Sequence, residues 1–289
     1  MKAISVKNFK KSYRSEFWLK KIPAIEDLSF EVEQSTVTGF LGANGAGKST
    51  TIKSILGLLI PDAGEIRFFG DKELSPETRS RIGFLPERPF FYEYLSGKEF
   101  LEFYAQLSGM KLGKKLNLRI EELLELVGLS HAGEKKLREY SKGMLQRVGI
   151  AQAIIHDPEL IIFDEPMSGL DPDGRYDVGQ ILQQIAEQGK TVFFSSHLLD
   201  DVERISKNLV VLKKGSLIYQ GSLAELLGNV DSDYRIEYTD STELFSEEVK
   251  DQESLQKRLD EIRQKKMAIV RVQPVKANLE QAYVNLNEK

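Results

Sequence analysis

The stretch that decides the fold is Thr36-Val37-Thr38-Gly39-Phe40-Leu41-Gly42-Ala43-Asn44-Gly45-Ala46-Gly47-Lys48-Ser49-Thr50. Residues 36–41 have the apolar character of a buried strand, and residues 51–59 have the apolar spacing of a helix. Between them, residues 42–49 fit the pattern G-x-x-x-x-G-K-[ST]. Glycines at these points allow backbone N–H groups to turn toward phosphate oxygens, and the N-terminus of the following helix favours the same anion. The order of strand, glycine loop and helix therefore predicts a phosphate-binding loop.

Side chains of the loop add charge and metal-binding capacity to this backbone cradle. Lys48 supplies a mobile cation for the outer phosphates, and the Ser49 hydroxyl can bind Mg²⁺. The alternative is an ordinary glycine turn before a helix, with a lysine at the surface. The predicted phosphate-binding residues of the loop are Gly42, Asn44, Gly45, Ala46, Gly47, Lys48, Ser49 and Thr50.

A second apolar run, residues 160–163, ends in the two carboxylates Asp164 and Glu165. In an open α/β sheet the carboxyl ends of the strands form the ligand-binding edge. Asp164 can hold Mg²⁺ through water, and Glu165, one residue further on, can face an attacking water. The alternative is a strand that ends in a solvated acidic turn. The presence of the glycine loop favours the catalytic interpretation over this alternative.

His197 follows a third predicted strand, residues 191–195, and is one of only three histidines in the chain. An imidazole at the end of that strand could hydrogen-bond a phosphate and hold the water at Glu165 in line. A single histidine is more often structural. Its spacing relative to the glycine loop and the acidic pair favours the functional interpretation.

The remaining pattern predicts an α/β protein with a small appendage. Residues 4–9 and 28–32 alternate like edge strands on either side of a polar insert at 14–21, and residues 97–155 are mostly helical in spacing. Alternating strands and helices return between 160 and 212, which implies a parallel sheet flanked by helices.

The tail differs in character. After a polar break at 229–233 it has strand-like segments at 234–238 and 268–272, an acidic stretch to 251, and helical spacing around Leu255 and Leu279. We expect a domain at 1–228 and a small α/β extension at 229–289.

Composition excludes several classes of protein. The chain has 289 residues, of which 41% are hydrophobic and 29% charged, so it is neither wholly disordered nor fibrous. The formal net charge of −4 argues against a strongly basic nucleic-acid binder, and the absence of cysteine excludes disulfides and thiolate catalysis. The start lacks a signal-peptide pattern, and no run of about 18 apolar residues is present, so we expect neither export nor a membrane span.

Together with these elements, the segment Tyr140-Ser141-Lys142-Gly143-Met144-Leu145-Gln146-Arg147 resembles the signature of the ATP-binding-cassette ATPases, the nucleotide-binding subunits of transporters. The resemblance covers roughly residues 1–225. It implies a RecA-like P-loop NTPase core with an antiparallel β subdomain and an inserted α-helical subdomain at about 97–157, here followed by a small C-terminal α/β extension.

The resemblance implies ATP and Mg²⁺ as cofactors and assigns further residues. Tyr13 would stack on adenine, and Asp171 in the segment 169–172 would contact the opposite subunit. In this family two cassettes pack head to tail, so Ser141 and Gly143 would complete the phosphate site of the partner. The catalytic residues would be Glu165, His197 and Lys48, and the metal ligands would be Ser49, Asp164 and Glu87.

The sequence departs from the family pattern at two places. Lys142 and Met144 replace a glycine and a glutamine of the usual signature, and Glu87 replaces the usual glutamine after Ile-Gly-x-x-Pro. Both variants resemble exporter-type cassettes that pair with a separately encoded membrane subunit. The aromatic segment 89–95 is either core or part of the groove that receives a helix of that subunit.

The resemblance therefore implies an ATPase subunit that drives substrate translocation, with export favoured. Its partners would be a second cassette, identical or homologous, and an integral membrane permease that holds it at the inner face of the cell membrane, on the cytoplasmic side. No nucleic acid is expected. One alternative is a soluble cassette protein acting on ribosomes or DNA, although such proteins usually carry two cassettes or a long coiled-coil insertion. A second is a regulatory subunit without turnover, against which Glu165 and His197 argue.

Overall fold

The computed structural model describes residues 1–14, 21–70, 72–228, 234–240, 242–250, 252–274 and 278–288. These residues form two compact units, Met1–Gln220 and Gly221–Lys289. Helix α8 (Leu223–Gly228) falls in the second unit, whereas the sequence pattern had suggested a division after residue 228. Residues 15–20 of the predicted polar insert and the predicted break at 229–233 lie outside the described residues.

The first unit is built on a nine-stranded sheet with the strand order β4-β1-β2-β9-β8-β3-β7-β6-β5. Its parallel part pairs β3 with β7 and β8, β7 with β6, and β6 with β5. These strands are β3 (Val37–Leu41), β5 (Ile82–Leu85), β6 (Leu160–Phe163), β7 (Thr191–Ser196) and β8 (Asn208–Lys213). The strands that apolar runs predict in this region, and the parallel arrangement itself, are present.

The sheet continues on the other side through β9 (Ser216–Ser222), which pairs parallel with β2 (Lys21–Glu33), and then through an antiparallel part made of β2, β1 (Lys2–Arg14) and β4 (Ala63–Phe68). The predicted strands at 4–9 and 28–32 are present but longer, because β1 and β2 pair along most of their length. Phe30, Phe40 and Phe193 stack with ring centroids 5.2–5.9 Å apart. This aromatic cluster joins the antiparallel part to the parallel part in one core.

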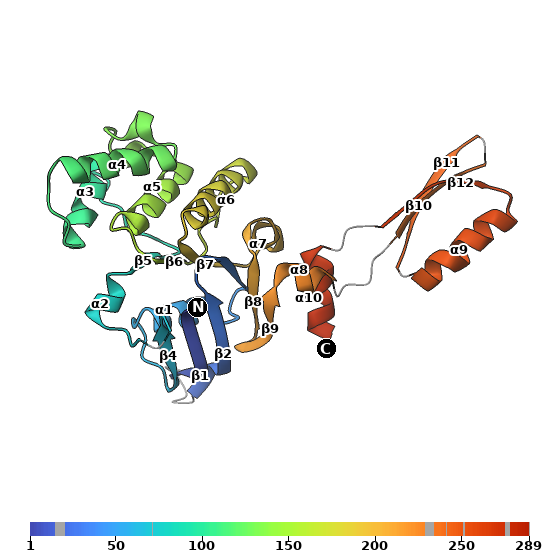
Figure 1. Cartoon of the computed structure of the whole chain (residues 1–289), viewed down its shortest axis with the longest axis horizontal. Coiled ribbons are helices and arrows are strands. Elements are labelled where there is room, and N and C mark those ends of the chain that lie inside the picture. Colours follow the sequence, from blue (N-terminus) through green and yellow to red (C-terminus); the bar gives the residue numbers. More distant parts are fainter. Residues whose placement is uncertain are drawn as a thin grey trace. The chain divides into compact units, whose positions relative to one another are not determined.

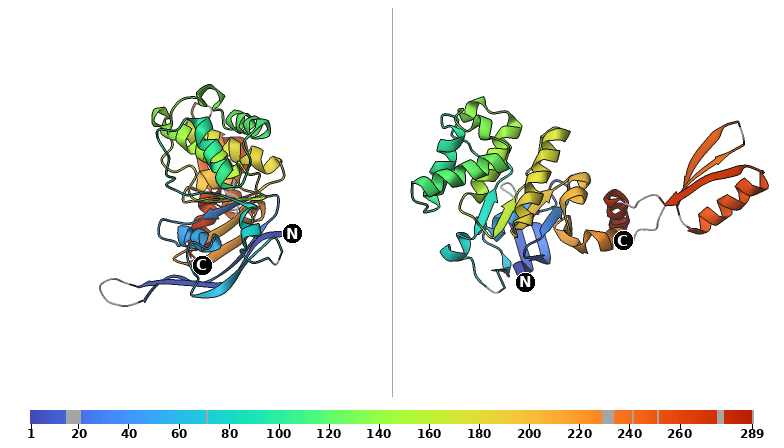
Figure 2. Two further views of the ribbon diagram at one scale, coloured as in Figure 1. Left: turned by 90° about the vertical axis from the view of Figure 1, so that its left-hand side faces the viewer. Right: turned by 45° about the horizontal axis from the view of Figure 1, so that its top comes forward.

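The α-helices of this unit are α1 (Lys48–Ile55), α2 (Pro76–Arg79), α3 (Gly97–Leu107), α4 (Lys114–Leu126), α5 (Lys142–Ile154), α6 (Pro172–Glu187) and α7 (Leu199–Ile205). Of these, α3, α4 and α5 make up the predicted helical block at 97–155. In Figure 1 and in both views of Figure 2, α3, α4 and α5 gather on one side of this unit and β1, β2 and β4 on the other. None of the helices in the described ranges is long and apolar enough to cross a membrane.

The second unit contains a three-stranded antiparallel sheet with the order β11-β10-β12. Its strands are β10 (Tyr234–Thr239), β11 (Leu244–Val249) and β12 (Ala268–Pro274), and the apolar side of α9 (Gln252–Gln264) packs on Ile236 and Tyr238. Helix α8 contacts the last helix, α10 (Leu279–Glu288). The sequence pattern missed β11 because its adjacent residues Glu247 and Glu248 break the apolar alternation and read as part of an acidic stretch; Glu247 is nevertheless held by Arg258 of α9 at 2.5 Å.

A substitution at Gly83 of β5 tests how closely α5 packs on the sheet. A Cβ at Gly83 would lie 2.1 Å from the backbone oxygen of Ala153 in α5, an atom that cannot move without the helix. Overpacking of this kind costs about 1–3 kcal/mol, so we expect Gly83→Ala to lower the thermal unfolding midpoint measured by circular dichroism. Gly179→Ala in α6 is the control, because its Cβ would meet only side-chain ends at 3.1 Å or more. Equal midpoints for the two variants would contradict the close approach.

Candidate active site

The glycine loop between β3 and α1 adopts a backbone that only glycine tolerates easily. Gly45 and Gly47 have φ angles of 81° and 107°, and a Cβ at Gly47 would lie 2.4 Å from Ile25 Cδ1. Helix α1 then begins at Lys48 without a side-chain cap and without an acidic residue in its first turn. Its first N–H groups are therefore available to an anion, as the sequence pattern predicted.

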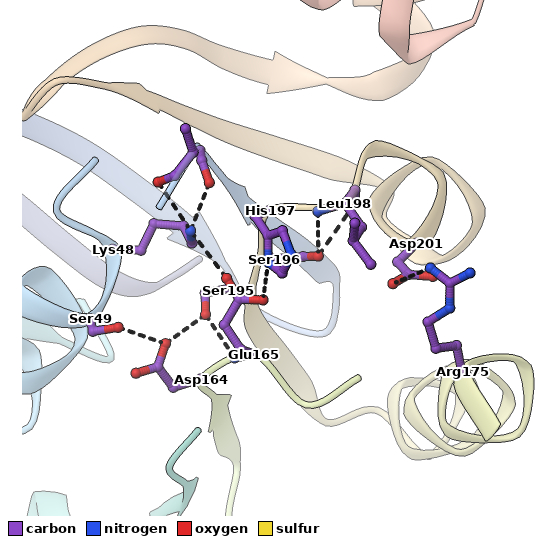
Figure 3. Close-up of polar contacts among 12 residues, drawn as sticks. Lys48, Ser49, Asp164, Glu165, Arg175, Ser195, Ser196, His197, Leu198 and Asp201 are labelled. Carbon is purple, nitrogen blue, oxygen red and sulfur yellow. Dashed lines mark hydrogen bonds and ion pairs between the residues drawn. The ribbon is translucent and has the colours of Figure 1, made fainter. Parts of the chain in front are cut away.

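Lys48 is buried, with 6% of its surface exposed. Its ammonium group donates to the backbone oxygen of Gly42 at 2.7 Å and forms an ion pair with Glu165 Oε1 at 3.1 Å (Figure 3). A buried ammonium needs such partners, since an unpaired buried charge is very costly. The lysine predicted to bind phosphate thus shares its charge with the carboxylate predicted to act on water.

Asp164 lies at the centre of a short hydrogen-bond network. Its Oδ1 accepts from Ser195 Oγ at 2.7 Å and from Ser49 Oγ at 3.3 Å. Ser195 Oγ in turn accepts from the backbone N–H of Glu165 at 2.9 Å, so one hydroxyl connects both carboxylate residues (Figure 3). Sequence reasoning missed Ser195. The sequence signal for Ser195 is a hydroxyl that directly follows the apolar run Val192 to Phe194 in a buried strand, two residues before His197.

Glu165 and His197 face each other across the ends of β6 and β7. His197 Nδ1 lies 2.8 Å from Glu165 Oε2; because a carboxylate can only accept, Nδ1 carries the hydrogen. Glu165 is 8% exposed and has a φ of 52°, in the left-handed region that non-glycine residues rarely adopt. Such strain costs about 1–3 kcal/mol and persists only where neighbours enforce it. Here Ser195 holds the N–H, and the N–H of Ser168 donates to the Glu165 carbonyl at 3.1 Å.

These side chains open onto one cavity of about 490 Å³. Tyr13, which lines the cavity and is 43% exposed, contacts Thr50 Oγ1 through its hydroxyl at 3.1 Å. The predicted residues that line the cavity are Tyr13, Asn44, Gly45, Gly47, Lys48, Ser49, Thr50, Glu87, Glu165 and His197. Gly42, Ala46 and Asp164 are not among the residues that line the cavity, and Ala24 and Ser168 line it without having been predicted.

Ser141, Gly143 and Asp171 line a different cavity of about 450 Å³, which shares no lining residue with the first. Ser141 caps α5 by accepting from the N–H of Met144 at 3.3 Å, and Asp171 caps α6 by accepting from the N–H of Gly174 at 3.0 Å. A single chain therefore places the predicted signature residues away from its own glycine loop. This is the arrangement expected if they serve another molecule.

The oxygen atoms around Ser49 and Asp164 are the possible ligands for the Mg²⁺ that the resemblance implies. Within the described residues, no three histidine, cysteine or acidic side chains lie close enough together to hold a metal ion. A hydroxyl beside one buried carboxylate, with Glu87 lining the same cavity, is instead an oxygen set of the kind Mg²⁺ uses when phosphates and water supply the remaining ligands. The residues present fit Mg²⁺ bound together with a nucleotide.

A glycine loop, a buried lysine and a carboxylate pair at the carboxyl edge of a parallel sheet define a nucleoside-triphosphate-binding protein of the P-loop class. The family model described as ABC transporter matches residues 25–168. An ABC transporter ATP-binding protein of Synechocystis is 46% identical over 230 residues, which cover 78% of this chain and 64% of that protein. The bacitracin transport ATP-binding protein BcrA of Enterococcus faecalis is 39% identical over 228 residues, covering 77% of this chain and 70% of BcrA. The chain belongs to the ABC transporter family, among its ATP-binding proteins.

Solved structures agree with this assignment. One described as the ATP-binding subunit of an ABC transporter has a TM-score of 0.70 and 28% identity, and covers 99% of both chains. A dimeric cassette bound to ADP and phosphate after hydrolysis has a TM-score of 0.68 and 25% identity, covering 76% of this chain and 98% of its own. The predicted family and fold class are therefore confirmed.

Ser195→Ala tests the network at Asp164. The change leaves the N–H of Glu165 without its buried partner, which costs about 1–3 kcal/mol, and leaves Asp164 Oδ1 with Ser49 as its only remaining partner in this network. We expect a lower unfolding midpoint in urea and weaker binding of magnesium nucleotide, measured by calorimetry. Ser54→Ala is the matched control, because Ser54 Oγ is also buried but has no hydrogen-bond partner among the described residues. If both variants behaved alike, the bridging role of Ser195 would be wrong.

Proposed function

We propose that the chain hydrolyses ATP and that this hydrolysis drives translocation through a separate membrane permease. The observation that carries the proposal is Glu165: a strained, buried carboxylate fixed between Lys48 at 3.1 Å and His197 at 2.8 Å on the wall of the cavity. A structural ion pair does not require a glutamate in the left-handed region. A carboxylate that must point to one position in a cavity does require such a backbone conformation.

Binding and activation are linked through Lys48. In the structure its charge is directed at Glu165 Oε1. Phosphates that enter the glycine loop attract the ammonium group, because they carry more charge than one carboxylate. Glu165 Oε1 then becomes free to accept a hydrogen bond from water. Hydrolysis of ATP therefore begins only after the phosphates have replaced Glu165 as the partner of Lys48.

The chemical step follows from the same geometry. Water attacks the γ-phosphorus, the bond to the bridging oxygen of ADP breaks, and the proton of the water passes to Glu165. His197 holds Glu165 Oε2 through Nδ1–H, which leaves its Nε2 as an acceptor that can orient the water. Ser49, Asp164 through water, and Glu87 would hold Mg²⁺, which neutralises charge on the β- and γ-phosphates.

Tyr13 is the proposed contact for the base. Its ring lines the cavity and is partly exposed, while its hydroxyl is fixed to Thr50 beside the glycine loop. An aromatic ring held in this way presents a face on which adenine can stack. The loop residues Gly42 to Thr50 then bind the phosphates.

The second cavity supports a shared site. Ser141 and Gly143 at the start of α5 line this cavity with Asp171 at the start of α6, and the N-terminal N–H groups of α5 that Ser141 does not cap could bind an anion there. We propose that two cassettes pack head to tail so that ATP lies between the glycine loop of one and Ser141 of the other, as the dimeric relative makes plausible. The permease would hold the pair at the cytoplasmic face of the membrane, and the likeness to a bacitracin transport protein favours export.

Glu165→Gln separates binding from hydrolysis. The amide keeps the shape of the side chain but cannot take a proton from water, and a positioned base typically contributes about 10²- to 10⁴-fold in rate. We expect phosphate release to fall by that factor while ATP binding, measured by equilibrium dialysis, persists. Glu187→Gln at the exposed end of α6 is the control and should leave the rate unchanged. Near-normal turnover by Glu165→Gln would remove this residue from the role of base.

Mixing two inactive variants tests the shared site. In a heterodimer of Lys48→Ala and Ser141→Arg, one of the two sites regains both normal halves. With random pairing and independent sites, the mixture should recover about a quarter of wild-type ATPase activity. Lys48→Ala mixed with Glu165→Gln is the control, because both changes lie on the same face and no pairing restores a site. Activity of the first mixture no higher than that of the control would contradict head-to-tail sharing.

A further inference from the structure

Helices α6 and α7 continue directly from the two segments that carry Glu165 and His197. The chain passes from Glu165 through residues 166–171 into α6, whose first turn contains Arg175. It passes from His197 through Leu198 into α7, whose first turn contains Asp201. Whatever fixes these two first turns against each other therefore also fixes His197 relative to Glu165.

Asp201 occupies the contact between the two helices. It is 3% exposed at its side chain, its Oδ1 accepts from Arg204 Nη2 at 3.5 Å, and its Oδ2 lies 3.8 Å from Arg175 Nη1 (Figure 3). The second distance is too long for a hydrogen bond. Among the described residues Oδ2 has no hydrogen-bond partner, although it is fully buried. The guanidinium of Arg175 is the charged group that α6 presents to this oxygen.

Other polar contacts hold the same two helices together. Arg204 Nη2 donates to the backbone oxygen of Arg175 at 3.0 Å, and Gln183 Nε2 donates to the backbone oxygen of Arg204 at 3.2 Å. Asp201 is the only carboxylate among these contacts. Burial raises its pKa, as does Asp200, whereas Arg175, Arg204 and His197 lower it. A buried carboxylate paired with arginines is often no more stabilising than apolar side chains of similar volume, which makes a purely packing role a poor explanation for its presence.

We infer that Asp201 is a positioning residue for hydrolysis: through Arg175 it ties the start of α7 to the start of α6 and so holds His197 in hydrogen-bond contact with Glu165. The inference rests on the proposed function, since it assumes that the contact between His197 and Glu165 serves hydrolysis. The inference also assigns Arg175 a role in transmitting movement. Asp171, the N-cap of α6, lines the cavity proposed to face the partner. A shift of residues 168–171 would therefore reach His197 through the contact between Arg175 and Asp201.

The ring of His197 reports its own position independently of activity. The chain has only three histidines, so ¹⁵N spectra of the imidazole groups contain few signals, and a His197→Gln variant identifies the one of interest. In the wild type, we expect the neutral ring to carry its hydrogen on Nδ1, because Glu165 Oε2 accepts there. In both Asp201→Asn and Arg175→Gln, we expect a mixture of the two neutral tautomers. Asp200→Asn, an exposed neighbour in the same helix turn, should leave the wild-type pattern.

Substitutions that remove side chains of opposite charge distinguish a positioning role from a purely electrostatic effect on His197. Removing Asp201 takes away a negative charge and removing Arg175 takes away a positive one, so a field effect alone would shift the pKa of His197 in opposite directions with Nδ1–H retained. Positioning predicts the same loss of Nδ1–H in both. Opposite pKa shifts without loss of that tautomer, or an unchanged ring in Asp201→Asn, would overturn the inference.

Kinetics supply the second readout. We expect Asp201→Asn and Arg175→Gln each to lower kcat for ATP hydrolysis about tenfold with KM for ATP within about twofold, since neither residue lines the nucleotide cavity. A loss confined to KM would contradict a positioning role. If wild-type protein did not hydrolyse ATP at all, the proposed function would fail, whereas the tautomer comparison would still decide whether Asp201 positions His197.

Discussion

The register of three parallel strands is the constraint on which the site depends. Leu41 of β3 lies opposite Ser196 of β7, and Phe163 of β6 lies opposite Phe194 of β7. Because parallel strands in register end at the same edge, the glycine loop, the acidic pair and His197 emerge side by side, although more than a hundred residues of chain separate the loop from the other two. A slip of one residue would turn alternate side chains to the other face and separate Asp164 from Ser195.

Local sequence pattern was enough to predict part of the site. The glycine loop, the apolar strands and their polar ends are local features, so Lys48, Asp164, Glu165 and His197 could be singled out from the order of residues alone. Ser195 and Asp201 could not, because their importance arises from partners that only the fold brings near: Ser195 meets Asp164 across the sheet, and Asp201 meets Arg175 across two helices. Strand β11 was missed for a related reason, since its glutamates are paired by α9 and β10.

Backbone strain and unfavourable electrostatic energy are concentrated at Glu165. Glu165 holds a strained backbone conformation and shares the single charge of Lys48, while the adjoining Asp164 adds a second buried carboxylate. Only Glu165 pairs with Lys48, so the carboxylate of Asp164, which contacts Ser49 and Ser195, leaves an excess of negative charge that a bound cation would relieve and an approaching phosphate would increase. A nucleotide would therefore bind more favourably as its Mg²⁺ complex. The same imbalance explains why a third acid, Glu87, on the cavity wall favours cation binding over binding of nucleotide alone.

Helix capping does not prevent Ser141 and Asp171 from acting on a partner. Ser141 Oγ accepts from the N–H of Met144, which occupies a lone pair and leaves the hydroxyl hydrogen free to be donated to a phosphate oxygen. Asp171 uses Oδ1 for its cap. The caps fix the orientation of both side chains at the starts of α5 and α6, so little conformational entropy would be lost if these side chains contacted a nucleotide held by another chain. Capping and the proposed contact with a partner's nucleotide are therefore compatible roles for Ser141 and Asp171.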